Sequence, residues 1–305
     1  MAGLVSVGSS RLLMGGRVSV FATDPGDAER LEAACGRILD RVEAWAGRLT
    51  RFASESELMR LNASPADLVQ VGPTLTAVLD WARQAEGMTD GLVDVALLDE
   101  RLAAEMGTDP ARVMRAGRRW SLRRLAHGSL VERRPGVRFD LGGVAKGWLA
   151  DRALAISPGR SAMVDADGDV AVRVAAGDTW GIGIGDPREH DTLLGGIELA
   201  GGEDGASRTF GIATSGISVH RWTTSRGVAH HLIDPRTGLP AETDVVQATV
   251  LAATARDAEI LAKAAVIAGT DRAFGLLDRP GVLGALLLTV RGDLRATPGM
   301  VRWLQ

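Results

Sequence analysis

Tyrosine is absent from this chain of 305 residues, and Cys35 is its single cysteine. One cysteine excludes an internal disulfide, so the chain is suited to a reducing compartment. Because Cys35 falls inside a segment with helical periodicity, we expect a buried thiol rather than a reactive one. Long apolar runs are also missing, as are a signal-peptide core and a lipobox cysteine near the start. We therefore expect no transmembrane segment and a cytoplasmic protein.

The chain has no large excess of either basic or acidic residues. The sequence has 35 basic and 38 acidic residues, which gives a formal net charge of −3, and it contains no basic run. This balance argues against a nucleic-acid-binding surface. Hydrophobic residues make up 46% of the chain and charged residues 24%, as in ordinary globular proteins, so we expect a sizeable core.

Helical periodicity recurs along the chain. The amphipathic segment Pro25–Leu49 predicts a long helix with Asp24 as its N-cap. Ser54 and Glu57 have the spacing of a capping box, which predicts the start of another helix. Further helices are predicted at Thr74–Glu86, Asp94–Met106 and Ala255–Ala268.

Short apolar or alternating runs between these segments predict strands. Leu12–Ala22 has the pattern of a strand pair or of one long strand. The glycine-rich, charged stretch Arg188–Ser207 is expected to be a mobile surface excursion. Strand runs followed by helices, without a steady alternation, predict an α+β fold with mixed or antiparallel sheets and flanking helices. The other predicted strands are Trp120–Leu122, Leu130–Phe139, Ala162–Val164, Val170–Val174, Trp180–Ile184, Gly211–Thr214, His230–Ile233, Val245–Leu251, Leu286–Val290 and Leu294–Ala296.

The segment Phe139–Asp151 joins an apolar lead-in to a predicted helix through an acid, paired glycines and a lysine. Gly142 and Gly143 allow a tight turn and a close approach of the backbone to a ligand. Lys146 falls at the helix start, where N–H groups and the helix dipole favour an anion, so a phosphate site is indicated. The spacing is neither a Walker loop nor a dinucleotide-binding pattern, and a plain glycine turn before a surface helix is the alternative.

Several segments, in order along nearly the whole chain, resemble one family. Asp-Leu-Gly-Gly-Val-Ala-Lys-Gly at Asp140–Gly147 is similar to the signature of the ApbE-type flavin transferases, the FAD:protein FMN transferases. The other matches are weaker one by one, and their common order makes the resemblance strong. They are Met14–Gly16 with Val18–Val20, Phe52–Asn62, Asp90–Val95, Ala213–Gly216 and His231–Gly238.

The resemblance implies one ApbE-like catalytic domain over residues 1–305 and a phosphoryl transfer. The family splits FAD at its pyrophosphate, moves FMN onto a threonine or serine hydroxyl of a flavoprotein, and releases AMP. We therefore expect FAD as donor and, as partner, an acceptor flavoprotein with a motif close to Asp-x-x-Ser/Thr-Gly-Ala/Ser-Thr. Two alternatives stay open: an FAD pyrophosphatase that gives FMN and AMP, and a non-catalytic FAD-binding protein.

Matched residue by residue, the motifs imply a cofactor site. Lys146 corresponds to the family's cofactor-binding lysine. Asp140 corresponds to an acid that contacts FAD, with an acid that caps its own glycine turn as the alternative. Phe52 replaces the usual tyrosine, a change that keeps ring stacking and loses a phenol hydrogen bond. Asp94 is expected to accept from an adenine amine or a ribose hydroxyl. The other positions matched to FAD contacts are Met14, Val93, Val95, His231 and Ile233.

The implied metal site departs from the family pattern. The family holds Mg²⁺ on a backbone carbonyl, here that of Gly143, and on an Asp and a Thr four residues apart, here Glu259 and Lys263. A carboxylate such as Glu259 suits Mg²⁺, whereas a cation at Lys263 repels it. Either Lys263 itself neutralises the pyrophosphate, or Glu259 and Lys263 form an ordinary helix-face ion pair and the metal site is lost. With Lys146, these two are the expected catalytic residues.

Two further clusters have simpler interpretations than catalysis. Val164–Asp169 carries three acids in five residues but lacks the length and the closing Glu of an EF-hand, so a strand-turn-strand hairpin is predicted. Asp234 precedes Pro235 and is predicted to shape a turn rather than to join Ser215 in a triad. His231 is expected to orient Asp234, to contact the flavin, or to be structural.

Overall fold

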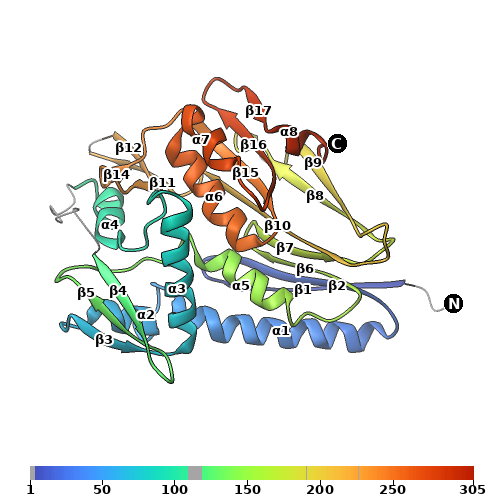
Figure 1. The fold of residues 1–305 in the computed structure, drawn as a ribbon, viewed down its shortest axis with the longest axis horizontal. Coiled ribbons are helices and arrows are strands. Elements are labelled where there is room, and N and C mark those ends of the chain that lie inside the picture. Colours follow the sequence, from blue (N-terminus) through green and yellow to red (C-terminus); the bar gives the residue numbers. More distant parts are fainter. Residues whose placement is uncertain (1–3, 109–118, 190, 226) are drawn as a thin grey trace.

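The computed structural model describes residues 4–108, 119–189, 191–225 and 227–305. Its centre is an eight-stranded sheet in which all neighbouring strands run antiparallel (Figure 1). The strands of the two chain ends form its two edges. In spatial order they are β1 (Leu4–Leu13), β2 (Gly16–Pro25), β6 (Ser161–Ala166), β7 (Asp169–Val174), β10 (Arg208–Gly216), β15 (Val245–Ala252), β16 (Val282–Thr289) and β17 (Leu294–Ala296).

Four helices cover one face of this sheet in the order of the strands beneath them. Helix α1 (Ala28–Leu49) packs on β1 and β2, and α5 (Ala145–Leu154) packs on β6 and β7. Helix α6 (Ala255–Ala268) lies on β10 and β15, and α7 (Thr270–Leu277) lies on β16. Burial of their apolar faces against the sheet is the main contribution to the stability of this layer. Cys35 is buried in α1, as predicted.

A two-stranded ribbon of β8 (Thr179–Gly185) and β9 (Leu193–Ala200) covers part of the opposite face. Ile197 of the ribbon is buried in one cluster with Val172 of β7. The short helix α8 (Pro298–Val301) closes the same cluster near the C-terminus. In this part of the molecule the chain therefore forms three layers, which are helices, sheet and ribbon.

The remaining elements lie beside the helix layer, away from the chain termini (Figure 1). A three-stranded sheet lies with two helices, and two short hairpins lie next to α4. Their bounds are α2 (Glu57–Ala63), β3 (Leu68–Val71), α3 (Pro73–Met88), α4 (Leu98–Met106), β4 (Trp120–Arg124), β5 (Ser129–Arg133), β11 (Arg221–Thr224), β12 (Gly227–His230), β13 (Ile233–Asp234) and β14 (Leu239–Pro240). None of the described helices has the length and apolar character needed to cross a membrane.

Helix α6 is enclosed on most sides, and none of its residues is fully exposed. The carboxylate of Asp151 in α5 holds its first turn, because it accepts from the N–H groups of Ala255 (2.9 Å) and Arg256 (3.0 Å). Gly147 lets α5 approach closely, since a Cβ there would overlap the carbonyl group of Ala255. Ionisable side chains on such a helix are rare unless they are paired or functional.

The α+β prediction is confirmed, and α6 has its predicted bounds. The predicted caps of two other helices are wrong. Helix α1 is capped by Asp27 instead of Asp24, because the Asp27 carboxylate accepts from the N–H groups of the first turn. Helix α2 is capped by Ser56 instead of Ser54, since the Ser56 hydroxyl accepts from the N–H of Met59 at 3.0 Å.

The predicted helix Asp94–Met106 begins only at Leu98. The carboxylate of Asp94 accepts from the N–H of Ala96 at 2.8 Å, and this local turn competes with helix formation.

The predicted strand Leu130–Phe139 ends at Arg133. Beyond that point the side-chain amide of Asn62 takes the place of a neighbouring strand. It donates to the carbonyl of Phe139 and accepts from the N–H of Phe139, both at 2.8 Å. A side chain 77 positions away in the sequence thus satisfies backbone groups that the prediction gave to a sheet.

Two further strand and loop predictions need correction. Within Arg188–Ser207, Leu193–Ala200 forms strand β9 and pairs with β8, so the middle of the stretch is part of a ribbon; residue 190 lies outside the described residues. His230–Ile233 is split between β12 and β13, because the N–H of Leu232 donates to the His230 ring. The predicted pair at Leu12–Ala22 is confirmed as the β1–β2 hairpin.

Candidate functional site

A cavity of about 290 Å³ lies where the ends of several elements meet. Its lining comes from α4 and the chain before it, the turn before α5, the β6–β7 turn, the end of β10 and the buried face of α6. The fold thus brings distant parts of the chain to one place. The ionisable side chains in this lining are Asp94, Arg101, Asp140, Lys146, Asp167, Asp169, His220, His231, Glu259 and Lys263.

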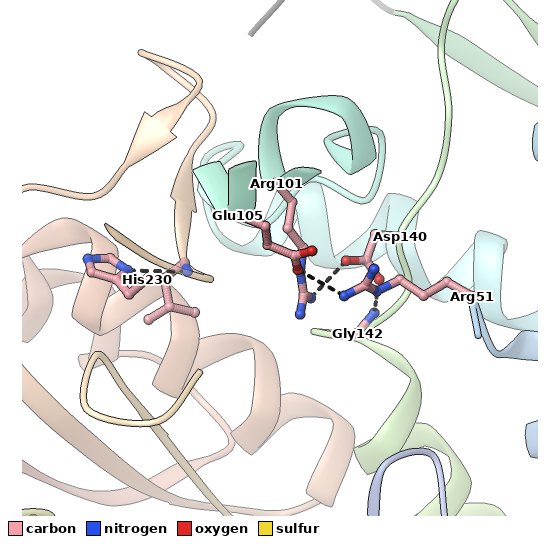
Figure 2. A network of polar contacts seen from close by, with 7 residues as sticks. Arg51, Arg101, Glu105, Asp140, Gly142 and His230 are labelled. Atoms are coloured by element: carbon pink, nitrogen blue, oxygen red, sulfur yellow. Dashed lines mark hydrogen bonds and ion pairs between the residues drawn. The ribbon is translucent and has the colours of Figure 1, made fainter. Parts of the chain in front are cut away.

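Arg101 and Asp140 line one side of the cavity, and they belong to a charge network with Arg51 and Glu105 that we call the α4 wall (Figure 2). Arg101 pairs with Asp140 at 2.8 Å and with Glu105 at 3.2 Å, and Arg51 pairs with Glu105 at 2.9 Å. Asp140 also accepts from the N–H of Gly142 at 3.0 Å, so it does cap its own glycine turn. Each charge of the α4 wall therefore lies against a charge of opposite sign.

Lys146 is the second residue of α5, at the helix start where the sequence predicts it. Its ammonium lies 3.3 Å from Asp169 and 3.5 Å from Asp167, both in the predicted β6–β7 hairpin, which is confirmed. Burial lowers the pKa of Lys146, but the carboxylates of Asp169, Glu259 and Asp167 outweigh it and raise that pKa above its usual value. Lys146 is therefore a fixed cation with its own counter-ions.

The opposite side, which we call the α6 wall, consists of Glu259 and Lys263. Oε2 of Glu259 accepts from the N–H of Gly147 at 2.9 Å, while Oε1 is buried without a hydrogen-bond partner. The ammonium of Lys263 lies over Gly143, close enough that a Cβ on this glycine would overlap Nζ. Among the residues that the structure describes, Lys263 has no hydrogen bond and no ion pair.

The predicted alternative of an ordinary Glu259–Lys263 ion pair is therefore wrong. Both side chains face the cavity, but Glu259 is directed to the backbone of α5 and Lys263 to the turn before it. Burial and the charge of Asp169 raise the pKa of Glu259 to about 8, against the opposing effect of Lys146. Burial lowers the pKa of Lys263. Both shifts show that the α6 wall disfavours charge that has no partner.

A histidine pair borders the cavity. The rings of His220 and His231 meet edge to face at 5.2 Å, and Nδ1 of His231 is buried without a partner. Burial, followed by the charge of Lys263, lowers the pKa of His231 to about 2, so this ring stays neutral. His230 is different, because its Nε2 lies 3.1 Å from the carbonyl of Ala241 inside the fold. Asp234 is held by Arg236 in the predicted turn, which excludes it from a triad.

The structure brings eight of the predicted site residues together and leaves four outside the lining. The eight are Gly143, Asp94, Asp140, Lys146, His231, Ile233, Glu259 and Lys263. Val93 and Val95 are buried behind Asp94, whose carboxylate pairs with Arg119. Met14 is in the β1–β2 turn, which lies against Asp167. Phe52 is 71% exposed, with the guanidinium of Arg51 over its ring at 4.4 Å.

Sequence reasoning missed Arg101 and undervalued Asp167 and Asp169. No local pattern marks Arg101, because its partner Asp140 is 39 positions away. The two aspartates were visible as an acidic hairpin, but only the fold shows that the hairpin faces Lys146.

Four of the six segments that carry the resemblance drawn from the sequence contribute to the cavity lining, and the segments at Met14 and at Phe52 do not. A family model described as the ApbE family matches residues 14–287. This chain belongs to the ApbE family. The order of the motifs in the sequence and their convergence in space therefore have a common explanation.

Curated and solved relatives agree with membership of the ApbE family. The FAD:protein FMN transferase of Treponema pallidum is 33% identical over 184 residues. This match covers 54% of this chain and 48% of the relative, so the chain spans about half of the relative's length. The FAD:protein FMN transferase of Salmonella typhimurium is 26% identical over 91% of this chain and 82% of its own.

Two solved ApbE structures share the fold. The ApbE protein of Thermotoga maritima superposes with a TM-score of 0.82 at 23% identity, over 99% of this chain and 100% of its own. The flavin transferase ApbE of Vibrio cholerae gives a TM-score of 0.74 at 22% identity, with the same coverage.

The donors at the expected metal position do not fit Mg²⁺, which prefers carboxylate and other oxygen ligands. The ammonium of Lys263 lies over Gly143, where the expected ligand set needs an oxygen donor. The described residues contain no group of three or more His, Cys, Asp and Glu side chains that could hold a metal. The side chains present at this position therefore do not suit Mg²⁺.

Proposed function

We propose that this chain moves FMN from FAD onto a serine or threonine hydroxyl of a partner flavoprotein, with residues 1–305 acting as one ApbE-like domain. The observation that supports this most is the meeting of four of the family motifs at one cavity whose lining includes both lysines, Lys146 and Lys263. The relatives named FAD:protein FMN transferase support the same activity.

In the proposed reaction the acceptor oxygen attacks the phosphorus of FAD that carries the riboflavin part. A new P–O bond forms to the acceptor, and the bond from this phosphorus to the bridging oxygen breaks. AMP leaves with the bonding electrons, and the hydroxyl proton passes to water. Because negative charge grows on the bridging oxygen, fixed positive charge beside the pyrophosphate lowers the barrier.

The residues of the cavity have distinct parts in this proposal. Lys146 and Lys263 hold the pyrophosphate oxygens, from the first turn of α5 and from α6. Glu259 is a positioning residue, because it binds the N–H of Gly147 and so fixes the first turn of α5 beside Lys146. Asp94 and Asp140 offer carboxylate oxygens to hydroxyl or amine groups of FAD. The other proposed FAD contacts are His231, Ile233, Met14, Phe52, Val93 and Val95.

The proposal is tested by incubating the chain with FAD and a flavoprotein domain that carries Asp-x-x-Thr-Gly-Ala-Thr. We expect the domain to gain the mass of FMN less water, and AMP to appear in equal amount. The same domain with its acceptor threonine replaced by alanine is the control and should stay unmodified.

The products also separate the alternatives. FMN and AMP without labelled protein would show a pyrophosphatase, and FAD that stays intact while bound would show a non-catalytic binding protein. Either result, obtained with an acceptor that another ApbE-family transferase does label, would overturn the proposed transfer.

A further inference from the structure

Lysine is used at only two positions in this chain. Of its 35 basic residues, Lys146 and Lys263 are lysines and all others are arginines. Both lysines line the same cavity. Lysine differs from arginine in presenting a compact charge with rotatable donors instead of a planar fork. A chain that uses arginine elsewhere thus places compact cations only at this site.

The two lysines differ in what surrounds them. Lys146 has two carboxylates within 3.5 Å. Lys263 has no ion pair or hydrogen bond with any residue in the described part of the chain, although it is on a helix without exposed residues. Lys263 is partly buried and lines the cavity, and a cation that is partly removed from water without a counter-ion is costly. An anionic ligand in the cavity would supply the missing counter-ion of Lys263.

The groups that face Lys263 do not supply a fixed negative charge. Asp140 is held by Arg101 at 2.8 Å, and Asp94 is paired with Arg119. Oε2 of Glu259 accepts from the N–H of Gly147, which directs this carboxyl to the backbone of α5 and not to the ammonium of Lys263. The remaining neighbour, His231, is neutral. The ammonium of Lys263 is therefore the charge of the α6 wall that an anionic ligand can neutralise.

We propose that Lys263 replaces a divalent cation at this site: its ammonium over Gly143 binds the diphosphate of the dinucleotide together with Lys146, and binding needs no Mg²⁺. The inference rests on the proposed function, because it takes FAD as the ligand. The ammonium donates hydrogen bonds to phosphate oxygens and offsets the charge that grows on the departing AMP. Gly143 is required for this arrangement, since any side chain at this position would displace Nζ of Lys263.

Calorimetry of FAD binding to the full chain, in EDTA and in millimolar Mg²⁺, tests this inference. We expect the wild-type Kd to agree within about twofold between the two buffers, and Lys263→Met to weaken binding by more than about tenfold in both. Arg302→Met removes an exposed charge at the end of α8 and is the matched control, with unchanged affinity. A wild-type affinity that rises about tenfold with Mg²⁺, or a Lys263→Met variant that binds normally, would overturn the inference.

A second variant acts on the same contact from the other side. In Gly143→Ala the three atoms nearest to the added methyl group belong to the flexible end of Lys263, so the fold should be kept while the ammonium is displaced. We expect FAD binding in EDTA to weaken about as much as in Lys263→Met. Normal binding by a folded Gly143→Ala chain would show that the position of Nζ over the turn does not matter.

The two lysines also allow a readout that needs neither activity nor flavin. A chain labelled with ε-¹³C-lysine should give two lysine signals in NMR spectra, and the one missing in Lys263→Met belongs to Lys263. Inorganic pyrophosphate added in EDTA should shift the Lys263 signal in the wild type. A Lys263 signal that stays fixed at saturating pyrophosphate would contradict the inference.

The outcomes separate this inference from the proposed function. FAD binding and FMN transfer that both require Mg²⁺ would sink the inference and leave the function standing. A Lys263 signal that responds to pyrophosphate, in a chain that binds no FAD, would keep the anion site and remove the flavin function.

Discussion

The two sides of the cavity treat charge in opposite ways. In the α4 wall Arg51, Arg101, Glu105 and Asp140 alternate in sign, and each has a partner at 3.2 Å or less. Among the described residues, the α6 wall has an ammonium without a hydrogen bond or ion pair and a carboxyl oxygen without a hydrogen bond. Both walls are built from charged side chains of limited exposure, so composition alone does not separate them.

The comparison shows how a structural ion network differs from a binding site. Buried charges that stabilise a fold satisfy one another, as in the α4 wall. Buried groups that stay unsatisfied lower the stability of the free protein, and they are retained where a ligand completes them. The α6 wall has this second character.

The largest expected effect on stability comes from removing an ion-pair partner from the α4 wall. Arg101→Met leaves Asp140 and Glu105 without this partner, and should lower the free energy of unfolding by about 2–3 kcal/mol, somewhat less than for a fully buried pair. Lys263→Met removes a cation that has no partner, so it should change that free energy by less than about 0.5 kcal/mol or raise it. Urea unfolding at pH 7 of the two variants and the wild type provides the measurement. Equal losses in both variants would remove the distinction between the walls.

A second expected effect is a pH dependence that belongs to the α6 wall. The pKa of Glu259 is raised to about 8 in the folded chain. The folded state therefore binds a proton that the unfolded state releases between about pH 4.3 and 8, and this contribution to stability is lost as the pH rises through that window.

The variant Glu259→Gln keeps a neutral side chain at every pH, so its stability relative to wild type should increase from pH 5 to pH 9. We expect the increase to exceed about 1.4 kcal/mol, the equivalent of one pKa unit. Urea unfolding at several pH values measures it, with the exposed Glu203→Gln as control. A constant difference between wild type and Glu259→Gln would mean that this carboxyl has an ordinary pKa.

The smallest expected effect concerns Phe52, an exposed aromatic residue outside the cavity lining. The Phe52 ring is 71% exposed in the free chain and is proposed to stack on the flavin. Phe52→Ala should therefore leave stability unchanged and weaken FAD binding about fivefold, within the usual range for an aromatic pair. Phe52→Tyr should bind FAD at least as well as wild type. Unchanged FAD affinity in Phe52→Ala, measured by calorimetry, would remove Phe52 from the site.

The sequence predicts the fold class and the long helices because their signals are local. Helix α6 has its predicted bounds, since periodicity and an N-cap at Thr254 lie within the segment. The failures come from distant partners. Asn62 takes the backbone of Phe139 out of the predicted strand, and the β8–β9 pairing orders a glycine-rich stretch that looks irregular by itself.

The candidate site shows the same division. The resemblance to the family singles out Lys146, Glu259 and Lys263, and all three line the cavity. Whether Glu259 and Lys263 pair is not encoded in their spacing of four residues. It depends on Gly147 and Gly143, which reach α6 from a different part of the chain. Arg101 leaves no trace in the sequence for the same reason.

The bond between Gly147 and Glu259 joins helices whose residues are 112 positions apart in the sequence. With the close contact between Gly147 and Ala255, it prevents α5 and α6 from sliding along each other. The helices that carry Lys146 and Lys263 are therefore held in one position relative to each other. In the function that we propose, the two phosphates of FAD contact these two lysines together. On that proposal a product with a single phosphate loses one of the two contacts, so cleavage of FAD weakens the binding of its own products.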